Sequence, residues 1–205
     1  MSMQLPLTCA ASTVLTSPKS GISAVNSAPF AHEIAMTIHD QTTETALRIV
    51  VMGVSGCGKS TVGAGLAKAL GLTFTDGDSL HSAANIAKMR SGEALNDSDR
   101  APWLAQVSAA VAAGGVVACS ALKRRYRDQI RAATDGPVLF LHLTGTPDVL
   151  SARIEARTGH FMPVALLASQ VATLEPLAPD EPGVTLDSDA ALSDVINAAL
   201  AATRA

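Results

Sequence analysis

The stretch Gly53-Val54-Ser55-Gly56-Cys57-Gly58-Lys59-Ser60 decides the fold. An apolar run over residues 47–52 precedes it, interrupted only by Arg48, and apolar residues at helical spacing follow it over residues 59–70. A glycine-rich turn between a strand and a helix lets successive backbone N–H groups converge on one anion, and the N-terminus of the helix adds its partial positive charge. The stretch therefore predicts a phosphate-binding P-loop.

Two side chains of this loop carry the expected chemistry. Lys59, a predicted catalytic residue, is placed to reach the β- and γ-phosphates of ATP, and Ser60 is placed to offer its hydroxyl to Mg²⁺ as a metal ligand. Cys57 is expected to turn its backbone N–H toward phosphate, and its thiol is interpreted as a small side chain tolerated in the turn. ATP and Mg²⁺ are therefore the predicted cofactors. The residues predicted to bind the nucleotide here are Gly53, Val54, Ser55, Gly56, Cys57, Gly58, Lys59, Ser60 and Thr61.

From residue 47 onward, strand patterns alternate with helical patterns. The predicted strands are 47–52, 72–75, 115–119, 138–143 and 184–186. The predicted helices are 59–70, 82–90, 99–113, 123–133, 147–157 and 190–202. The helix from residue 99 is expected to be capped by Asp97 or Asp99, with Pro102 in its first turn. Strands separated by helices predict an α/β fold, in which a parallel sheet carries helices on both faces.

Residues 1–46 differ from the rest of the chain in composition and in the pattern of apolar residues. They mix Ser, Thr, Ala and Pro, carry few charges and show no sustained period. Lys19 is the only basic residue before His32, which disfavours a secretory signal, and the first arginine is Arg48, which disfavours an organelle transit peptide. We expect a disordered extension, or a start placed upstream of the true one with Met36 as the initiator, followed by one domain over residues 47–205.

Composition and charge exclude several classes of function. A net charge of −3 disfavours a basic surface that would bind a polyanion. With only 3% aromatic residues, the chain has few side chains on which the bases of a single-stranded nucleic acid could stack. No stretch reaches the roughly 18 apolar residues of a membrane span. The three cysteines, Cys9, Cys57 and Cys119, form no C-x-x-C pair, which argues against a disulfide framework or a zinc site. We therefore expect a protein of the reducing cytoplasm, with no nucleic-acid or membrane partner.

The second predicted strand ends in Asp76-Gly77-Asp78, at the edge where parallel sheets present their ligands. Of two carboxylates at this spacing, one can face the metal shell and the other can accept a proton from a substrate hydroxyl. A solvated acidic turn is the alternative. The guanine-reading N-K-x-D motif is missing and the chain is short for a motor domain. The pattern therefore favours a small-molecule kinase over a GTPase or a motor.

A family resemblance rests on several separate blocks in a fixed order. They are Gly77-Asp78-Ser79-Leu80-His81, Asn85-Ile86-Ala87-Lys88-Met89, Asp97-Ser98-Asp99-Arg100-Ala101-Pro102-Trp103-Leu104, Cys119-Ser120-Ala121-Leu122-Lys123, Tyr126-Arg127-Asp128, Gly159-His160-Phe161-Met162-Pro163, Ser169-Gln170 and Thr173-Leu174-Glu175-Pro176. With these blocks the chain resembles the bacterial gluconokinases from about residue 49 to its C-terminus, except that Ser82 and Ala94 stand where the family usually has proline. The resemblance implies a nucleoside-monophosphate-kinase-like P-loop fold with a small lid. It also implies transfer of the γ-phosphoryl group of ATP to the 6-hydroxyl of D-gluconate.

The chain is also similar, more distantly, to the shikimate kinases, whose paired aspartates occupy the corresponding strand end. By that resemblance Asp76 belongs to the Mg²⁺ shell, and Asp78 binds the reacting hydroxyl and acts as the catalytic base. The family motifs also imply substrate binding by His81 and His160. Trp103 is interpreted as a packing anchor.

A polyhydroxylated monoanion such as gluconate needs cations as well as mixed donors and acceptors. Lys123 and Arg127 lie four residues apart and would share a helix face near the carboxyl end of the third strand. They are predicted to bind the carboxylate and its neighbouring hydroxyls. Arg100 is a third candidate for substrate binding, with an ion pair to Asp97 or Asp99 as the equal alternative.

Two further arginines precede the segment that the resemblance identifies as the lid, about residues 157–170. Arg153 and Arg157 lie four residues apart on the helix that enters it. In related kinases the lid closes over ATP and brings arginines to the phosphates or to the face of the adenine. Both arginines are therefore predicted to bind the nucleotide, with surface arginines as the alternative.

Two other functions stay open. One is a shikimate-type or adenylylsulfate-type kinase, which differs in the hydroxyl substrate that stimulates ADP release. The other is a nucleotide-binding regulatory module, which the intact Lys59, Ser60 and Asp78 disfavour. The sequence does not fix the oligomeric state, so a homodimer is left open beside the small-molecule substrate.

Overall fold

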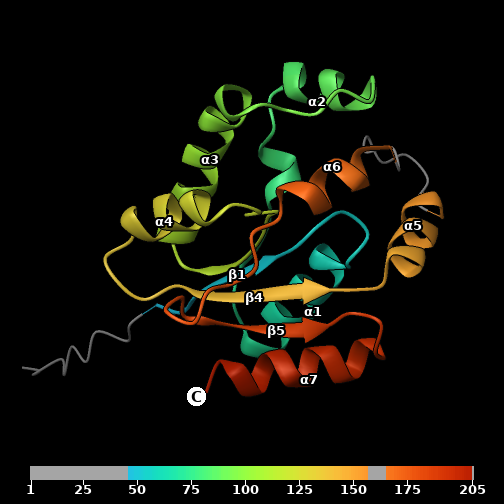
Figure 1. Ribbon diagram of the computed structural model, residues 1–205. Helices are drawn as coiled ribbons and strands as arrows, with labels where there is room; N and C mark the ends of the chain where they lie inside the picture. Colours follow the sequence, from blue (N-terminus) through green and yellow to red (C-terminus); the bar gives the residue numbers. More distant parts are fainter. Residues whose placement is uncertain (1–45, 157–164, 205) are drawn as a thin grey trace, which may run out of the picture. The chain divides into compact units, whose positions relative to one another are not determined.

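The computed structural model describes residues 46–156 and 165–204, which fold around a five-stranded parallel sheet (Figure 1). The strands are β1 (Arg48–Met52), β2 (Phe74–Asp76), β3 (Gly115–Ala118), β4 (Leu139–Thr144) and β5 (Gly183–Asp187). Their order in the sheet is β2-β3-β1-β4-β5, and all four pairings are parallel. The predicted α/β fold is confirmed.

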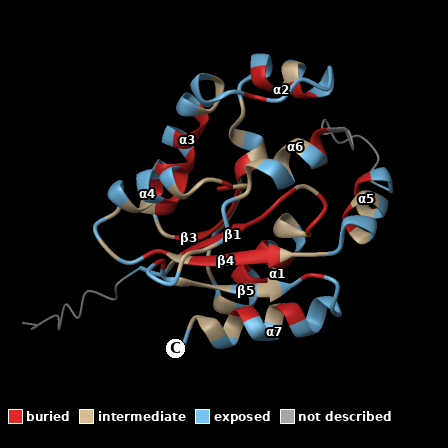
Figure 2. Ribbon diagram, in the orientation of Figure 1, coloured by how far each residue is buried: buried red, intermediate tan, exposed pale blue. Residues whose placement is uncertain are grey.

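Helices cover both faces of the sheet. They are α1 (Lys59–Leu70), the 3₁₀ turn η1 (Gly77–Leu80), α2 (Ala83–Arg90), α3 (Asp97–Ala112), α4 (Arg124–Ala132), α5 (Pro147–Glu155), α6 (Ala165–Thr173) and α7 (Leu192–Ala202). Side chains alternate along a strand, so β1 feeds two cores. Val51 packs with α1 and α7 in one core, whereas Val50 packs with α3 and α4 in the other. The central strands are buried on both sides (Figure 2).

Two helices begin in ways that matter for function. α1 starts after Gly58, whose φ of 86° places it in the left-handed region and whose position offers no capping side chain. The first N–H groups of α1 therefore have no side-chain cap of their own, as an anion site requires. α3 starts at Asp97 behind Asn96, which forms a capping box with Asp99. The predicted cap at Asp97 or Asp99 was therefore wrong, and Pro102 lies inside the helix instead of in its first turn.

The sequence prediction missed α6, because it assigned this stretch to the lid. Residues 165–170, the last part of the predicted lid, form the first part of α6, and residues 157–164 lie outside the described residues. The N-terminal extension expected over residues 1–46, with Met36, also lies outside them apart from Ala46. No helix among the described residues is long and apolar enough to cross a membrane.

Candidate active site

The P-loop lies tightly against the carboxyl ends of its neighbouring strands. Gly53 has a φ of 139°, and a Cβ there would lie 2.5 Å from the carbonyl oxygen of Leu143, so this position requires glycine. The N–H of Gly53 donates to the carbonyl of Ser120 at 3.3 Å. Cys57 is fully buried in the core beside α1, and its N–H donates to Val54 O at 3.4 Å. The buried side chain fits the interpretation of Cys57 as a small residue tolerated in the turn. Its N–H, which was expected to face phosphate, instead donates within the loop.

The acidic turn after β2 has a fixed shape. Asp76 Oδ1 accepts from the N–H of Asp78 at 3.0 Å, and the indole Nε1–H of Trp103 donates to the carbonyl of Gly77 at 2.7 Å. A Cβ on Gly77 would lie 2.6 Å from the carbonyl oxygen of Ala118, so only glycine lets the turn approach β3 this closely. Asp76 and Asp78 are both half-buried in this turn.

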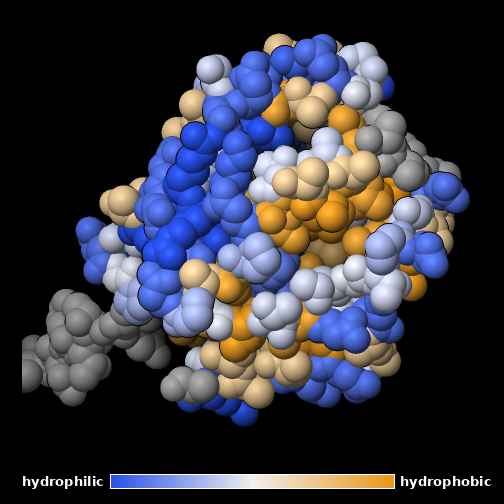
Figure 3. All heavy atoms as spheres, viewed as in Figure 1, coloured by the Kyte–Doolittle hydropathy of each residue, from blue (hydrophilic) through white to orange (hydrophobic). Residues whose placement is uncertain are grey.

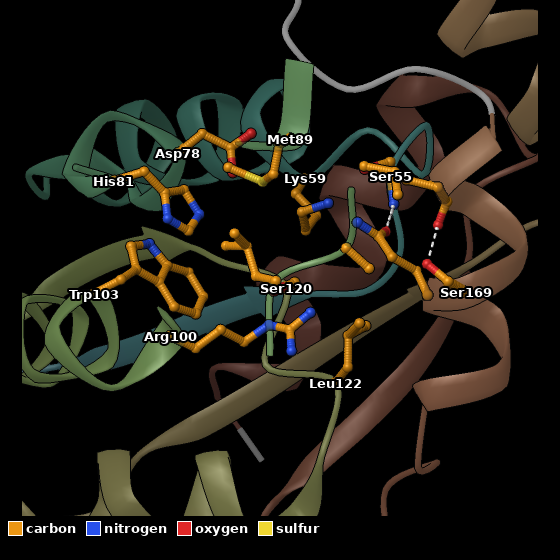
Figure 4. Close-up of a pocket in the computed structure, with 14 residues that line it drawn as sticks. Ser55, Lys59, Asp78, His81, Met89, Arg100, Trp103, Ser120, Leu122 and Ser169 are labelled. Atoms are coloured by element: carbon orange, nitrogen blue, oxygen red, sulfur yellow. Dashed lines mark hydrogen bonds between the residues drawn. The ribbon is translucent and has the colours of Figure 1, made fainter. Parts of the chain in front are cut away.

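One cavity, here called the acceptor cavity, joins the P-loop to the acidic turn (Figure 4). Its polar and charged lining residues are Ser55, Lys59, Asp78, His81, Arg100, Ser120, Ser169 and Gln170. Lys59 and Arg100 bring cations to it, and Asp78 brings a carboxylate. In this conformation Lys59 Nζ donates to the carbonyl of Val54 at 3.0 Å. The cavity thus combines the residue types that an anionic hydroxyl substrate needs.

The charged side chains of the P-loop and of the acidic turn lie near Cys119, the residue that follows β3. Burial raises the pKa of the Cys119 thiol to about 12, with Lys59 acting in the opposite sense and Asp78 and Asp76 adding to the rise. All three charges therefore lie within electrostatic reach of one buried atom. The Cys119 thiol is therefore protonated at neutral pH.

His81 and Trp103 form a stacked pair at one wall of the acceptor cavity. Their ring centroids lie 4.7 Å apart with an interplanar angle of 8°. Burial lowers the pKa of His81, which the Asp78 carboxylate raises and Arg100 lowers further. His81 is therefore present mainly as a neutral ring at pH 7. Sequence reasoning treated Trp103 only as a packing anchor, although its position three residues after Arg100 on one helix could have suggested a shared face.

Arg100 faces the acceptor cavity rather than a neighbouring carboxylate. Asp99 pairs with Lys88 at 2.8 Å, and Asp97 pairs with Lys123 at 3.2 Å. Within residues 46–156 and 165–204, Arg100 forms no ion pair, so the alternative role is not found there. Lys123 lines a second cavity of about 190 Å³, the side cavity, which shares Arg100 and Gln170 with the acceptor cavity.

Arg127, which was predicted to bind the substrate, is buried in the structure and lies away from the substrate site. Its side chain is completely buried, and its guanidinium donates to both carboxylate oxygens of Glu181 at 2.7 Å. It also donates to the carbonyls of Ala121 and Glu175. The helical spacing from Lys123 was misleading, because Lys123 is the residue that precedes α4 and Arg127 points into the protein. Arg127 therefore links α4 to the segment that follows α6, and its buried guanidinium cannot contact a substrate.

The other edge of the P-loop borders a cavity of about 360 Å³, here called the nucleotide cavity. Gly56, Gly58 and Thr61 line it together with Arg153 from α5. Arg153 Nη2 donates to the carbonyl of Ser188 at 2.8 Å, which ties α5 to the loop after β5. The other two predicted ligands near the lid, Arg157 and His160, lie outside the described residues.

Comparisons with known proteins find similarity to two related kinds of small-molecule kinase. A family model described as shikimate kinase matches residues 55–176. The chain is 47% identical over 165 residues to a gluconokinase of Gluconobacter oxydans (strain 621H), a match that covers 75% of this chain and 90% of that protein. It is 43% identical over 154 residues to the thermoresistant gluconokinase of Escherichia coli (strain K12), covering 72% of this chain and 87% of that one. The solved structure of a gluconokinase from Sinorhizobium meliloti 1021 matches with a TM-score of 0.70 and 46% identity, over 77% of this chain and 91% of that one.

Proposed function

The chain belongs to the gluconokinase family, and from that premise we propose that it transfers the γ-phosphoryl group of ATP to the 6-hydroxyl of D-gluconate. The predicted resemblance is confirmed by the relatives' identity over most of the chain. The observation that carries the proposal is that Lys59 of the P-loop, Asp78 of the acidic turn and Arg100 of α3 line one cavity. A phosphate-binding lysine, a carboxylate and a cation for the substrate are thereby brought together.

The two edges of the P-loop line two different cavities, one proposed for each substrate. Ser55 and Lys59 line the acceptor cavity, whereas Gly56, Gly58 and Thr61 line the nucleotide cavity. ATP bound along the loop from the nucleotide cavity would therefore present its terminal phosphate to the acceptor cavity. Phosphoryl transfer depends mostly on such in-line positioning and on neutralising the charge of the transferred group.

Lys59 and Asp78 are the proposed catalytic residues. The Lys59 ammonium would leave its loop carbonyl to neutralise charge on the β- and γ-phosphates as the transfer proceeds. The Asp78 carboxylate would hold the reacting hydroxyl in line with the phosphorus and accept its proton as the new O–P bond forms. The hydrogen bond from the N–H of Asp78 to Asp76 sets the direction from which Asp78 enters the cavity.

The remaining polar groups of the cavity fit a hydroxylated acid. Arg100 is the proposed partner of the gluconate carboxylate, with Lys123 of the side cavity as a second cation. Lys123 forms an ion pair with Asp97, so it offers the substrate less uncompensated positive charge than Arg100 does. Neutral His81, oriented by its stack on Trp103, is proposed to exchange a hydrogen bond with a hydroxyl of the sugar chain.

Mg²⁺ is proposed as the accompanying metal, with Ser60 and Asp76 as its protein-side partners. The residues present fit this ion: Asp76 uses Oδ1 for the Asp78 N–H, and its Oδ2 makes no hydrogen bond within the described part of the chain. No cluster of three or more metal-binding side chains occurs among the described residues. Mg²⁺ keeps waters and substrate phosphates as ligands and needs only one or two protein groups, which Ser60 and Asp76 would supply. When bound, the ion would neutralise charge on the phosphates.

Several finer predictions remain part of this proposal. Arg153 supports nucleotide binding through its place on the wall of the nucleotide cavity. Arg157, His160 and the lid over about residues 157–170 are proposed from the resemblance alone. A cytoplasmic location and a homodimer also remain predictions.

The substrate is tested by a coupled assay of ADP release with Mg-ATP and a panel of gluconate, shikimate and related sugar acids. The proposal expects turnover with gluconate and none with shikimate. Turnover of shikimate without gluconate would favour the shikimate-type alternative, which the match to a shikimate kinase model keeps relevant. ADP release that no acceptor stimulates would point instead to the regulatory module.

A further inference from the structure

The side chain of Gln170 joins α6 to the P-loop. The backbone N–H of Ser55 donates to Gln170 Oε1 at 2.7 Å, across 115 positions of sequence, and this bond is the dashed line that ends at Ser55 in Figure 4. A backbone N–H can only donate, so the oxygen edge of the carboxamide must face Ser55. The NH₂ edge of the same planar group, with its two donors, therefore faces away from the loop.

The space on that side is where the acceptor would lie. Gln170 lines the acceptor cavity together with Lys59 and Asp78, and it also lines the side cavity together with Lys123. Its neighbour Ser169 lines both cavities too, but the Ser169 hydroxyl donates to the carbonyl of Leu166 at 2.8 Å. Gln170 is thus placed between the reacting end of the site and its cationic end, with a donor group to offer.

α6 holds Gln170 on a rigid base. Leu167 packs in the core that contains Val54 of the P-loop, and Leu166 packs with Met89 and Leu95. These leucines lie three and four residues before Gln170, so they share its face of the helix. Just after α6, the N–H of Glu175 donates to Leu122 O at 2.8 Å, and Arg127 donates to the carbonyl of Glu175 at 3.0 Å. The position of Gln170 is therefore set by the folded domain on both sides of it.

We propose that Gln170 is a positioning and specificity residue that holds the P-loop with its oxygen and binds the acceptor with its nitrogen. Oε1 keeps the Ser55 backbone in place, while Nε2 donates to a hydroxyl in the middle of the acceptor's polyol chain. A single planar group then sets the distance between the loop that holds the γ-phosphate and the molecule that receives it. This inference rests on the proposed gluconate kinase activity and adds a determinant for hydroxylated acceptors.

Two variants separate the two halves of this role. Gln170→Glu keeps an oxygen for Ser55 but replaces the donor by a negative charge that faces an anionic acceptor. It should raise KM for gluconate by at least about 3- to 10-fold, the value of one lost hydrogen bond, with charge repulsion adding to the loss. KM for ATP should change less than KM for gluconate, because the bond to Ser55 is kept. Gln170→Leu removes both contacts and should also lower kcat, because the loop loses its brace. Val171→Ala is the control on the same helix, and it should change neither KM, because Val171 is exposed and lines neither cavity.

The decisive experiment combines these variants with gluconate analogues that each lack one hydroxyl. In the wild-type protein one analogue should lose about 3- to 10-fold in kcat/KM through the missing partner of Gln170. In Gln170→Leu the same analogue should be used as well as gluconate, since the contact is already gone. Equal losses for every analogue in both proteins, or a Gln170→Glu variant with unchanged KM for gluconate, would overturn the inference and leave Gln170 as a brace only. Wild-type protein that does not turn over gluconate would instead overturn the proposed function, and this inference with it.

Discussion

At the scale of single residues, Trp103 fixes the geometry of the acidic turn. Its indole N–H satisfies the carbonyl of Gly77, and its ring stacks on His81. The indole is 2% exposed, so both contacts are made in a water-poor environment where an unpaired carbonyl is costly. Asp78, next to Gly77, therefore depends on α3 for its position.

Replacing Trp103 by Phe tests this dependence. Trp103→Phe keeps an aromatic ring for His81 but leaves the carbonyl of Gly77 without its donor, which should lower the free energy of unfolding by about 1–3 kcal/mol. Steady-state kinetics should show a lower kcat with an unchanged KM for ATP. Val111→Ala, which opens a small cavity in the same helix away from the turn, is the control for lost stability and should leave kcat unchanged. Equal kinetic effects of the two substitutions would contradict a positioning role.

Asp78 carries the sharpest prediction at this scale. Asp78→Asn keeps the size of the side chain and one acceptor oxygen but removes the base. It should lower kcat about 10²–10⁴-fold, while ATP affinity, measured by titration, stays near the wild-type value. Asp76→Asn is the paired variant and should chiefly raise the Mg²⁺ concentration needed for activity. A chief defect of Asp78→Asn in ATP binding, or a near-normal kcat, would show that the base has been assigned to the wrong carboxylate.

At the scale of elements, a buried ion pair joins α4 to the loop that leads into β5. Arg127 and Glu181 are both 0% exposed in their side chains, and Arg127 holds the pKa of Glu181 below its usual range. The same guanidinium donates to the carbonyl of Ala121, a non-glycine residue at a φ of 42°. It thereby supports a strained backbone position between β3 and α4. The pair therefore fixes the course of the chain before α4 and after α6.

Breaking this pair should unfold the protein more readily without altering the substrate site directly. Arg127→Met leaves the buried Glu181 carboxylate with only Arg131 at 3.4 Å and the N–H of Ala178 as partners, which should cost about 3–5 kcal/mol in urea unfolding. Arg124→Met, on the same helix but with an exposed partner in Asp180, is the control and should have little effect. The folded fraction of Arg127→Met should keep its KM for gluconate. A stable variant with a strongly raised KM for gluconate would restore Arg127 as a substrate ligand.

At the scale of the whole molecule, polar and apolar residues are distributed unevenly over the surface. The face in Figure 3 shows a hydrophilic area over α3 and α4 and an apolar area over the middle of the molecule. The hydrophilic area follows from α4, whose arginines pair with Asp97, Asp128 and Asp180. These arginines of α4 therefore form ion pairs with carboxylates of the same domain.

The parts of the fold that were predicted are those with local signals. α1 was predicted over the residues it occupies, because a P-loop glycine precedes it and Gly71 ends it. The buried strands read as continuous apolar runs. Contacts between distant positions could not be read in this way. Arg127 and Glu181 lie 54 positions apart, and Ser55 and Gln170 lie 115 apart, so helical spacing alone gave no sign of either partner.

The domain boundary remains a prediction at this scale. Residues 1–46 lack periodicity, so we expect the domain over residues 47–205 to fold and act without them. Protein that begins at Met36 should match the full chain in kcat, in KM for both substrates and in its urea midpoint. A clear loss in any of these quantities would show that the residues before Met36 take part in folding or function.

The identity of the product shows whether the protein phosphorylates the 6-hydroxyl of gluconate. The protein is incubated with Mg-ATP and ¹³C-labelled gluconate, and the product is examined by ¹³C and ³¹P NMR while ADP is measured in the same sample. We expect one phosphate ester whose phosphorus couples to C6 of gluconate, formed in equal amount to ADP. A phosphate on another oxygen would contradict the placement of the 6-hydroxyl at Asp78. ADP formed together with free phosphate, and no phosphorylated gluconate, would contradict the kinase activity itself.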